Sequence, residues 1–114
     1  MSRIEVSTDR RDEGVVTVVL RGELDISNAG RVEQELLQIE GDGPTTLVLD
    51  LRGLEFMDST GLRLVVAADA RAREQGRRLV LVQGPDAVHR VFKITFVDKR
   101  LDFVGDPAEV RAEP

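Results

Sequence analysis

The sequence contains no cysteine, no tryptophan and no tyrosine, and it contains a single histidine. Without cysteine the chain has no disulfides and no thiol chemistry, which fits a reducing compartment. A structural zinc site needs several cysteine or histidine ligands, so this composition argues against one. We therefore expect neither a bound metal nor another cofactor.

Long apolar runs are absent as well. No segment approaches the roughly 18 consecutive apolar residues that a membrane-spanning helix needs. The N-terminal residues 1–5 also lack the apolar core of a signal peptide. These two absences predict a cytoplasmic protein without a membrane segment.

The charge and aromatic content argue against a nucleic-acid partner. The net charge is −5, and the four phenylalanines are not interleaved with basic residues. The charge is also unevenly distributed along the chain. Residues 1–62 contain six basic and 13 acidic side chains, whereas residues 63–100 contain nine basic and four acidic ones. Such asymmetry predicts a dipolar surface that can orient a partner.

The length and patterning of the chain predict one α/β domain over residues 1–114, with its core at about residues 4–105. The first two strands are separated by a short charged turn, which predicts an antiparallel hairpin. The later strands alternate with helices, which predicts right-handed parallel crossovers. We expect a mixed, mostly parallel sheet of four to five strands packed with about four helices. Expected strands are residues 4–8, 15–20, 45–51, 79–82 and 101–104, and expected helices are residues 29–39, 62–75, one from residue 86 and a brief one after residue 106.

The junction at residues 56–62, between a strand and a helix, is the most informative part of the chain. Asp58 is placed to cap the helix, and Ser59 and Thr60 put two hydroxyls in its first turn. The helix dipole and the unpaired N–H groups of a first turn tolerate a phosphate there. The spacing leaves two interpretations open, because Asp58 can be a simple cap or Ser59 or Thr60 can be a switch residue.

A second polar loop, at residues 22–25, also follows a strand. In open α/β sheets, ligand and partner sites lie beyond the carboxyl ends of the strands. We therefore expect Glu23 and Asp25 to lie near Ser59.

Enzymatic interpretations have little support. Ser59 as a nucleophile needs a base, and the only histidine, His89, has no orienting acid visible in the sequence. No sugar-binding aromatics accompany the carboxylates of Glu23 and Asp25. The glycines form no phosphate-binding loop. We expect a binding protein rather than an enzyme.

A two-component receiver domain is a second α/β interpretation, with Asp50 as phospho-acceptor and Lys99 as the phosphate-binding lysine. Such a site also needs an acidic pair after the first strand to bind Mg²⁺. Here the first strand is followed by a charged turn and a second strand, with no helix between them. The order of elements therefore argues against a receiver domain.

Several segments together resemble the STAS domain of anti-sigma factor antagonists. The resemblance covers about residues 4–110 in the family's order, and its most specific part is Asp-Ser-Thr-Gly-Leu. The C-terminus departs from the family, because residues 107–114 allow only a short final helix. The matching segments are residues 21–25 (Arg-Gly-Glu-Leu-Asp), 47–51 (Leu-Val-Leu-Asp-Leu), 56–62 (Phe-Met-Asp-Ser-Thr-Gly-Leu), 76–82 and 88–92.

This resemblance implies a partner-switching protein. In the family, the unphosphorylated antagonist binds an anti-sigma factor that is a serine/threonine kinase, and the sigma factor is released. The kinase then phosphorylates the serine that follows the motif's aspartate, here Ser59, with Thr60 as the second choice. A metal-dependent serine phosphatase later removes the phosphate.

The expected partner-binding surface surrounds Ser59. We assign Asp58 to orienting the Ser59 hydroxyl and the helix start, and Asp25 to contacting the kinase. The other expected contact residues lie in the first turns of the helix, and for the last three of them core packing or a solvated charge is an equally open interpretation. They are Thr60, Gly61, Leu62, Arg63 and Val66.

A scaffold role is the alternative function. In that interpretation the chain is a non-phosphorylated STAS subunit of a transporter or of a signalling assembly. The intact Asp58–Gly61 element favours the antagonist instead. The expected oligomeric state is a monomer, or a weak dimer through the edge strand at residues 4–8.

Overall fold

The protein is described from a computed structural model that covers residues 2–11 and 14–110. One sheet contains five strands in the same order as the chain, β1-β2-β3-β4-β5. β1 pairs antiparallel with β2, and the remaining neighbours are parallel. This confirms the predicted mixed, mostly parallel sheet. The strands are β1 (Ile4–Arg10), β2 (Val15–Leu24), β3 (Thr46–Met57), β4 (Arg78–Val82) and β5 (Phe103–Val104).

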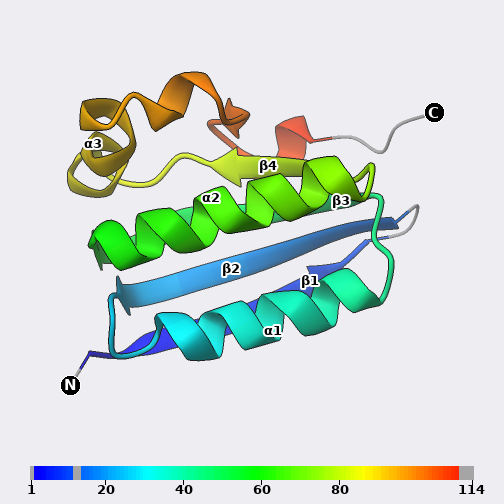
Figure 1. The fold of residues 1–114 in the computed structure, drawn as a ribbon, viewed down its shortest axis with the longest axis horizontal. Helices are drawn as coiled ribbons and strands as arrows, with labels where there is room; N and C mark the ends of the chain where they lie inside the picture. The colour runs from blue at the N-terminus through cyan, green and yellow to red at the C-terminus, as the bar shows by residue number, and fades with distance from the viewer. Residues whose placement is uncertain (1, 12–13, 111–114) are drawn as a thin grey trace.

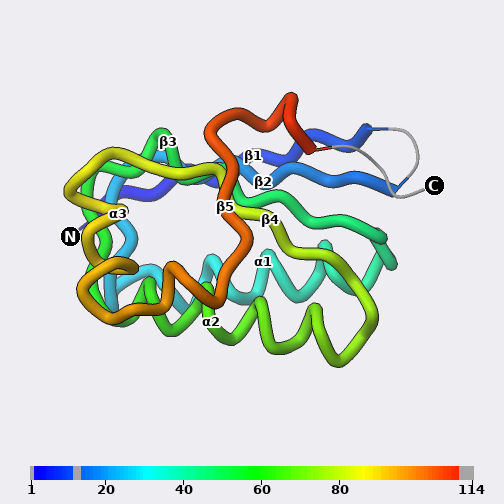
Figure 2. The backbone as a smooth tube through the Cα atoms, turned by 90° about the horizontal axis from the view of Figure 1, so that it is seen from above, coloured from blue at the N-terminus to red at the C-terminus, as the bar shows by residue number. Residues whose placement is uncertain are grey.

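Within the described residues the α-helices are α1 (Ala29–Gly41), α2 (Ser59–Glu74) and α3 (Asp86–Ile94). α1 and α2 lie side by side on one face of the sheet, and the C-terminal segment crosses the other face (Figures 1 and 2). None of these helices is long and apolar enough to cross a bilayer.

The prediction of about four helices is one too many for the described chain. The segment after Asp106 is a three-residue 3₁₀ turn, η3 (Pro107–Glu109), like the earlier turn η2 (Val97–Lys99). It ends because Val110 is extended and buried in a small valine cluster. Residues 111–114, where the brief helix was also expected, lie outside the described residues.

β2 and β3 run further than the predicted strands, which ended at residues 20 and 51. Their pairing continues to Leu24 and Met57 through two register shifts, and Gly22 lies between these shifts. Gly22 has a φ of 111°, and a side chain there would collide with the backbone carbonyl of Arg3. Gly22, which was expected in a loop after the strand, therefore allows a bulge, and the strand continues beyond it.

The main core lies between the sheet and the helices, as helical spacing predicted. The buried positions of α1 and α2 recur every three to four residues, which gives each helix one apolar face. These positions are Ala29, Val32, Leu36 and Ile39 in α1, and Leu64, Val65, Ala68 and Ala72 in α2.

A smaller valine cluster covers the opposite face of the sheet. It joins Val15, Val48, Val80 and Val82 to Val110 from the C-terminal segment. β3 is therefore buried on both faces along its first half, as expected for a central strand.

Candidate functional site

The start of α2 is built around a side-chain cap. Asp58 has an extended backbone, and its Oδ1 accepts hydrogen bonds from the N–H groups of Thr60 at 2.9 Å and Gly61 at 3.3 Å. Ser59 is the first residue of the helix and is exposed to solvent. The capping interpretation of Asp58 is thus correct, and it leaves the Ser59 side chain on the surface.

The cap changes how this helix start can receive a phosphate. Two N–H groups of the first turn already bind the Asp58 carboxylate, and the N–H of Leu62 donates to the Asp58 carbonyl oxygen at 3.2 Å. A phosphate on Ser59 would therefore depend on solvent and on the helix dipole more than on free amides. The carboxylate of Asp58 binds backbone here and does not orient the Ser59 hydroxyl.

The two segments predicted to be neighbours do lie together, although residues 22–24 belong to β2 and are not part of a loop. Leu24 pairs with Met57 at the ends of β2 and β3, and the N–H of Asp58 donates to the Leu24 carbonyl oxygen at 3.3 Å. Asp25 follows Leu24 directly, so its loop adjoins the start of α2. This junction lies at one end of the molecule, where α1 and α2 both begin (Figure 1).

Asp25 is held in place by hydroxyl and amide groups. The Ser2 hydroxyl donates to one carboxylate oxygen, and the Ser27 hydroxyl and N–H donate to the other at 2.6 and 2.9 Å. The Ser2 bond first, and then the Ser27 bonds, hold the pKa of Asp25 below its ordinary value. Asn28 occupies the N-cap position of α1, but its side chain instead bridges the Asp25 N–H and the Glu23 carbonyl oxygen.

Three of the expected contact residues line one groove between α1 and α2. Thr60, Arg63 and Val66 form the α2 side of this groove of about 530 Å³, and Ala29 and Glu33 lie on the α1 side. Arg63 is exposed, whereas Thr60 and Val66 are half-buried. The groove begins within one residue of Ser59, so these side chains can contact a molecule that covers the serine.

Gly61 and Leu62 are placed differently. Gly61 is buried, and a Cβ there would lie 2.5 Å from Met57 Cγ and 3.0 Å from Leu24 Cγ. Leu62 is half-buried and packs against the main core. These two residues hold the first turn of α2 tightly against the ends of β2 and β3.

Comparisons with known proteins identify the family. A family model described as "Mlab, STAS domain" matches residues 7–105. The chain belongs to the STAS-domain family. The anti-sigma-B factor antagonist of Listeria monocytogenes is similar to this STAS domain, with 32% identity over 81% of each chain. A crystal structure of an anti-sigma factor antagonist from Mycobacterium paratuberculosis superposes with a TM-score of 0.81 at 29% identity, over 94% of this chain and 90% of that one.

A further relative is matched over a shorter stretch. The anti-sigma-F factor antagonist RsfB of Mycobacterium tuberculosis is 31% identical over 71 residues, which are 62% of this STAS domain and 58% of that protein. The chain thus spans a little over half the length of that relative. The resemblance inferred from the motif segments is confirmed by these comparisons.

Two exposed apolar residues beside the site escaped the sequence analysis. Ile26 is 81% exposed in the loop that carries Asp25, and Phe56 is 49% exposed opposite Glu23. The signal in the sequence was a large aliphatic residue in an otherwise polar turn.

The other candidate residues of the STAS domain have structural partners. His89 packs edge-on against Phe103 at 4.8 Å between ring centroids. Asp50 is buried and accepts hydrogen bonds from Arg52 Nε and an Arg52 terminal nitrogen at 3.0 and 2.8 Å. Burial raises the pKa of Asp50, but the bonds and charge of Arg52 outweigh it and keep the pKa low. Among the described residues, no group of three His, Cys, Asp or Glu side chains could hold a metal ion.

Proposed function

We propose that this STAS domain is an anti-sigma factor antagonist whose binding is controlled at Ser59. In this proposal the unphosphorylated protein binds an anti-sigma factor in the cytoplasm, and a bound sigma factor is released. The anti-sigma factor is a serine/threonine kinase that phosphorylates Ser59, and a metal-dependent phosphatase reverses the modification. The protein itself acts as a binding module rather than as an enzyme.

The observation that carries the proposal is the exposed hydroxyl of Ser59 at the first position of α2. Among the described residues this hydroxyl has no hydrogen-bond partner, so a kinase can reach it without breaking a contact. Thr60 is a weaker candidate, because it is half-buried in the groove wall. The named relatives support the same function, since the one matched over 81% of both chains is an anti-sigma factor antagonist.

Phosphorylation of Ser59 is expected to change the surface while leaving the fold intact. The phosphate adds a charge of about −1.5 to −2 at neutral pH, next to the carboxylates of Asp25 and Asp58. A partner that covers Ser59 would have to desolvate this dianion and bring its own acidic groups near it. A loss of about 3–4 kcal/mol would weaken binding several-hundred-fold, which is sufficient for a switch.

The test uses the purified protein, ATP and an anti-sigma factor kinase from the same genome. Mass spectrometry should find one phosphate on the wild type and on Thr60→Ala, and none on Ser59→Ala. Calorimetry should then show that Ser59→Ala still binds the kinase, whereas the phosphorylated wild type binds it several-hundred-fold more weakly. Phosphate transfer to Ser59→Ala at the wild-type rate would exclude Ser59 as the switch.

A further inference from the structure

The end of α3 exposes two large apolar side chains that the proposed function does not use. Ile94 is 67% exposed and Phe96 is 70% exposed. The opposite face of the same helix is buried, because Val88 and Phe92 belong to the main core. Ile94 is the last residue of α3 and Phe96 precedes the turn η2, so both exposed apolar side chains lie at the end of a helix that is anchored in the core.

Phe96 is presented in an unfavourable backbone conformation. Its φ of 61° lies in the left-handed region, where glycine is the usual residue after a helix. The turn is nevertheless well held, since the Phe96 N–H donates to the Lys93 carbonyl oxygen at 3.0 Å. The Thr95 hydroxyl donates to the Val91 carbonyl oxygen at 2.8 Å, and Val97 packs on the core. The backbone that carries the ring is thus held before any partner arrives, which reduces the backbone entropy lost on binding.

The charge around these two residues is positive. Residues 90–100 contain four basic side chains and one acidic side chain, in a protein whose net charge is −5. All four basic residues are exposed, and Lys99 Nζ lies 6.0 Å from the ring centroid of Phe96. A hollow of about 540 Å³ adjoins Ile94 and has two basic residues, Arg90 and Lys93, and one acidic residue, Asp86, in its wall. Carboxylates next to apolar side chains would complement this surface.

We propose that this surface, formed by Arg90, Lys93, Ile94, Phe96 and Lys99, binds an acidic segment of a partner protein that also carries apolar side chains. It is called the α3 surface below. The carboxylates of the segment would pair with the basic residues, while its apolar side chains would cover Ile94 and Phe96. This binding does not depend on Ser59, so it adds a second docking surface to the proposed switch.

The same features argue against an anionic membrane or a nucleic acid as the molecule that binds the α3 surface. A membrane or a nucleic acid extends well beyond the α3 surface and meets the negative charge of the rest of the molecule, whereas a short segment meets mainly the local charge. Membrane-surface helices bury a broad apolar face, but only two large apolar residues are exposed here. Single-stranded nucleic acid needs successive stacking platforms, and Phe96 provides one.

A library of short random peptides displayed on phage tests this proposal, because the selection itself finds the sequences that bind. The library is selected on the wild-type protein and counter-selected on the double variant Ile94→Ser/Phe96→Ser. We expect the enriched peptides to combine Asp or Glu with Leu, Ile or Phe. An enriched peptide, synthesised with a fluorophore, should bind the wild type in anisotropy measurements with an affinity that falls as salt is added.

Single variants then separate binding from folding. Phe96→Ser and the charge reversal Lys93→Glu/Lys99→Glu should each weaken the peptide about tenfold or more. Leu37→Ser, which removes an exposed apolar side chain of α1, should leave the affinity unchanged. Phe96→Gly is the most informative variant, because it should raise the melting temperature while weakening the peptide about tenfold.

Three results would overturn the proposal. They are the absence of enriched peptides, enrichment of peptides without net negative charge, and equal binding of the enriched peptide to the double variant. Phosphatidylglycerol vesicles and a single-stranded oligonucleotide serve as further probes. If either binds the wild type and loses binding in the double variant, the α3 surface belongs to that class of partner instead.

Discussion

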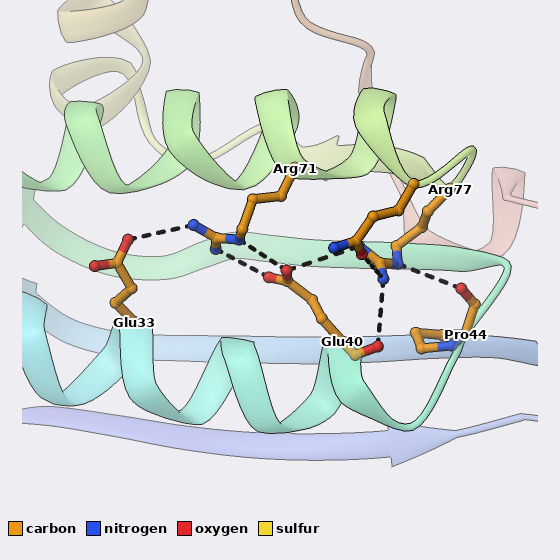
Figure 3. Close-up of polar contacts among 6 residues, drawn as sticks. Glu33, Glu40, Pro44, Arg71 and Arg77 are labelled. Atoms are coloured by element: carbon orange, nitrogen blue, oxygen red, sulfur yellow. Dashed lines mark hydrogen bonds and ion pairs between the residues drawn. The ribbon is translucent and has the colours of Figure 1, made fainter.

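Helices α1 and α2 are joined by ion pairs at one end and separated by a groove at the other. The two helices run in the same direction along one face of the sheet (Figure 1). The end at which both helices begin, which includes Ser59, is called the near end, and the end at which both helices stop is called the far end. At the far end, the Glu40 carboxylate accepts hydrogen bonds from Arg71 Nε and a terminal nitrogen at 2.8 and 3.0 Å (Figure 3). At the near end, the helices are separated by the groove beside Thr60 and Arg63.

The ion pairs at the far end are buried, so breaking them is expected to destabilise the fold. The side chains of Glu40 and Arg77 are 5% and 6% exposed and form an ion pair at 3.7 Å. Arg77 also donates to the carbonyl oxygens of Glu40 and Pro44, which ties α1 to the start of β3 (Figure 3). Hydrogen bonds from Arg71 to Glu40 raise the pKa of the Arg71 guanidinium above its ordinary value. Buried ion pairs therefore join α1 and α2 at the far end, whereas a groove separates the two helices at the near end.

The largest expected change in the free energy of unfolding comes from removing the Glu40 carboxylate at the far end. Glu40→Ala would leave Arg71 and Arg77 without their shared carboxylate in a mostly buried place. Removing one partner of a buried ion pair typically destabilises a protein by about 3–5 kcal/mol. Urea unfolding followed by circular dichroism should show a loss of that order.

The matched control is an ion pair on the outside of α2. Asp69 pairs with Arg73 at 2.9 Å, and the Arg73 side chain is 67% exposed. Asp69→Ala should therefore cost less than about 1 kcal/mol. If Glu40→Ala and Asp69→Ala destabilise the protein equally, the far end is not locked by its ion pairs.

The next effect concerns how tightly the near end packs on the sheet. Gly61→Ala would place a methyl group 2.5 Å from Met57 Cγ, so we expect a loss of about 1–3 kcal/mol in the free energy of unfolding. Gly30 is the control, because a Cβ there has no atom within 4 Å and the residue lies in α1. Gly30→Ala should be neutral or stabilise the protein by up to about 1 kcal/mol. A neutral Gly61→Ala would show that the start of α2 can move away from β2 and β3.

A smaller effect is expected from the cap of α2. Asp58→Ala removes the acceptor for the N–H groups of Thr60 and Gly61 and should cost about 1 kcal/mol. Asp58→Asn keeps a capping oxygen and should recover most of this loss. Thermal unfolding of both variants measures the difference. Equal losses in the two variants would mean that the negative charge of Asp58, rather than its hydrogen bonds, stabilises the helix start.

The order of elements, the buried helix faces and the meeting of the two polar loops were all predictable from the sequence. Each follows from a short-range pattern, because residue spacing reports burial directly and parallel strands end at one edge of the sheet. The cap at Asp58 was predictable as well, although the expected helix began at residue 62 and α2 begins three residues earlier, at Ser59. A capping aspartate ahead of an apolar repeat locates a helix start.

The remaining features depend on residues far apart in the chain. The bulge at Gly22 exists because the Arg3 backbone passes there, and the hold on Asp25 needs Ser2. Glu40 meets Arg71 only after α1 and α2 have packed together. No local sequence pattern indicates such contacts. The extension of β2 and β3, the hydrogen bonds that hold Asp25 and the ion pairs of Glu40 could therefore not be predicted from the sequence.

The smallest predicted effect is a loss of folding stability in acid, as the Asp25 carboxylate at the near end becomes protonated. The hydrogen bonds from Ser2 and Ser27 keep the pKa of Asp25 below its ordinary value of 3.8. A lowered pKa means that the stabilisation by Asp25 is complete above the unfolded value and is lost as the pH falls through the folded one. The stability difference between wild type and Asp25→Asn should therefore be constant at neutral pH and shrink in acid, in urea unfolding at several pH values.

Ser27→Ala sharpens this measurement, because it removes the hydroxyl donor to Asp25 and keeps the backbone N–H donor. The pKa of the Asp25 carboxyl, followed by NMR, should then move up toward 3.8. A wild-type pKa at or above 3.8 would contradict the prediction. It would mean that the hydrogen bonds from Ser2 and Ser27 do not hold the Asp25 carboxylate in solution, and that the loop beside Ser59 is not ordered by them.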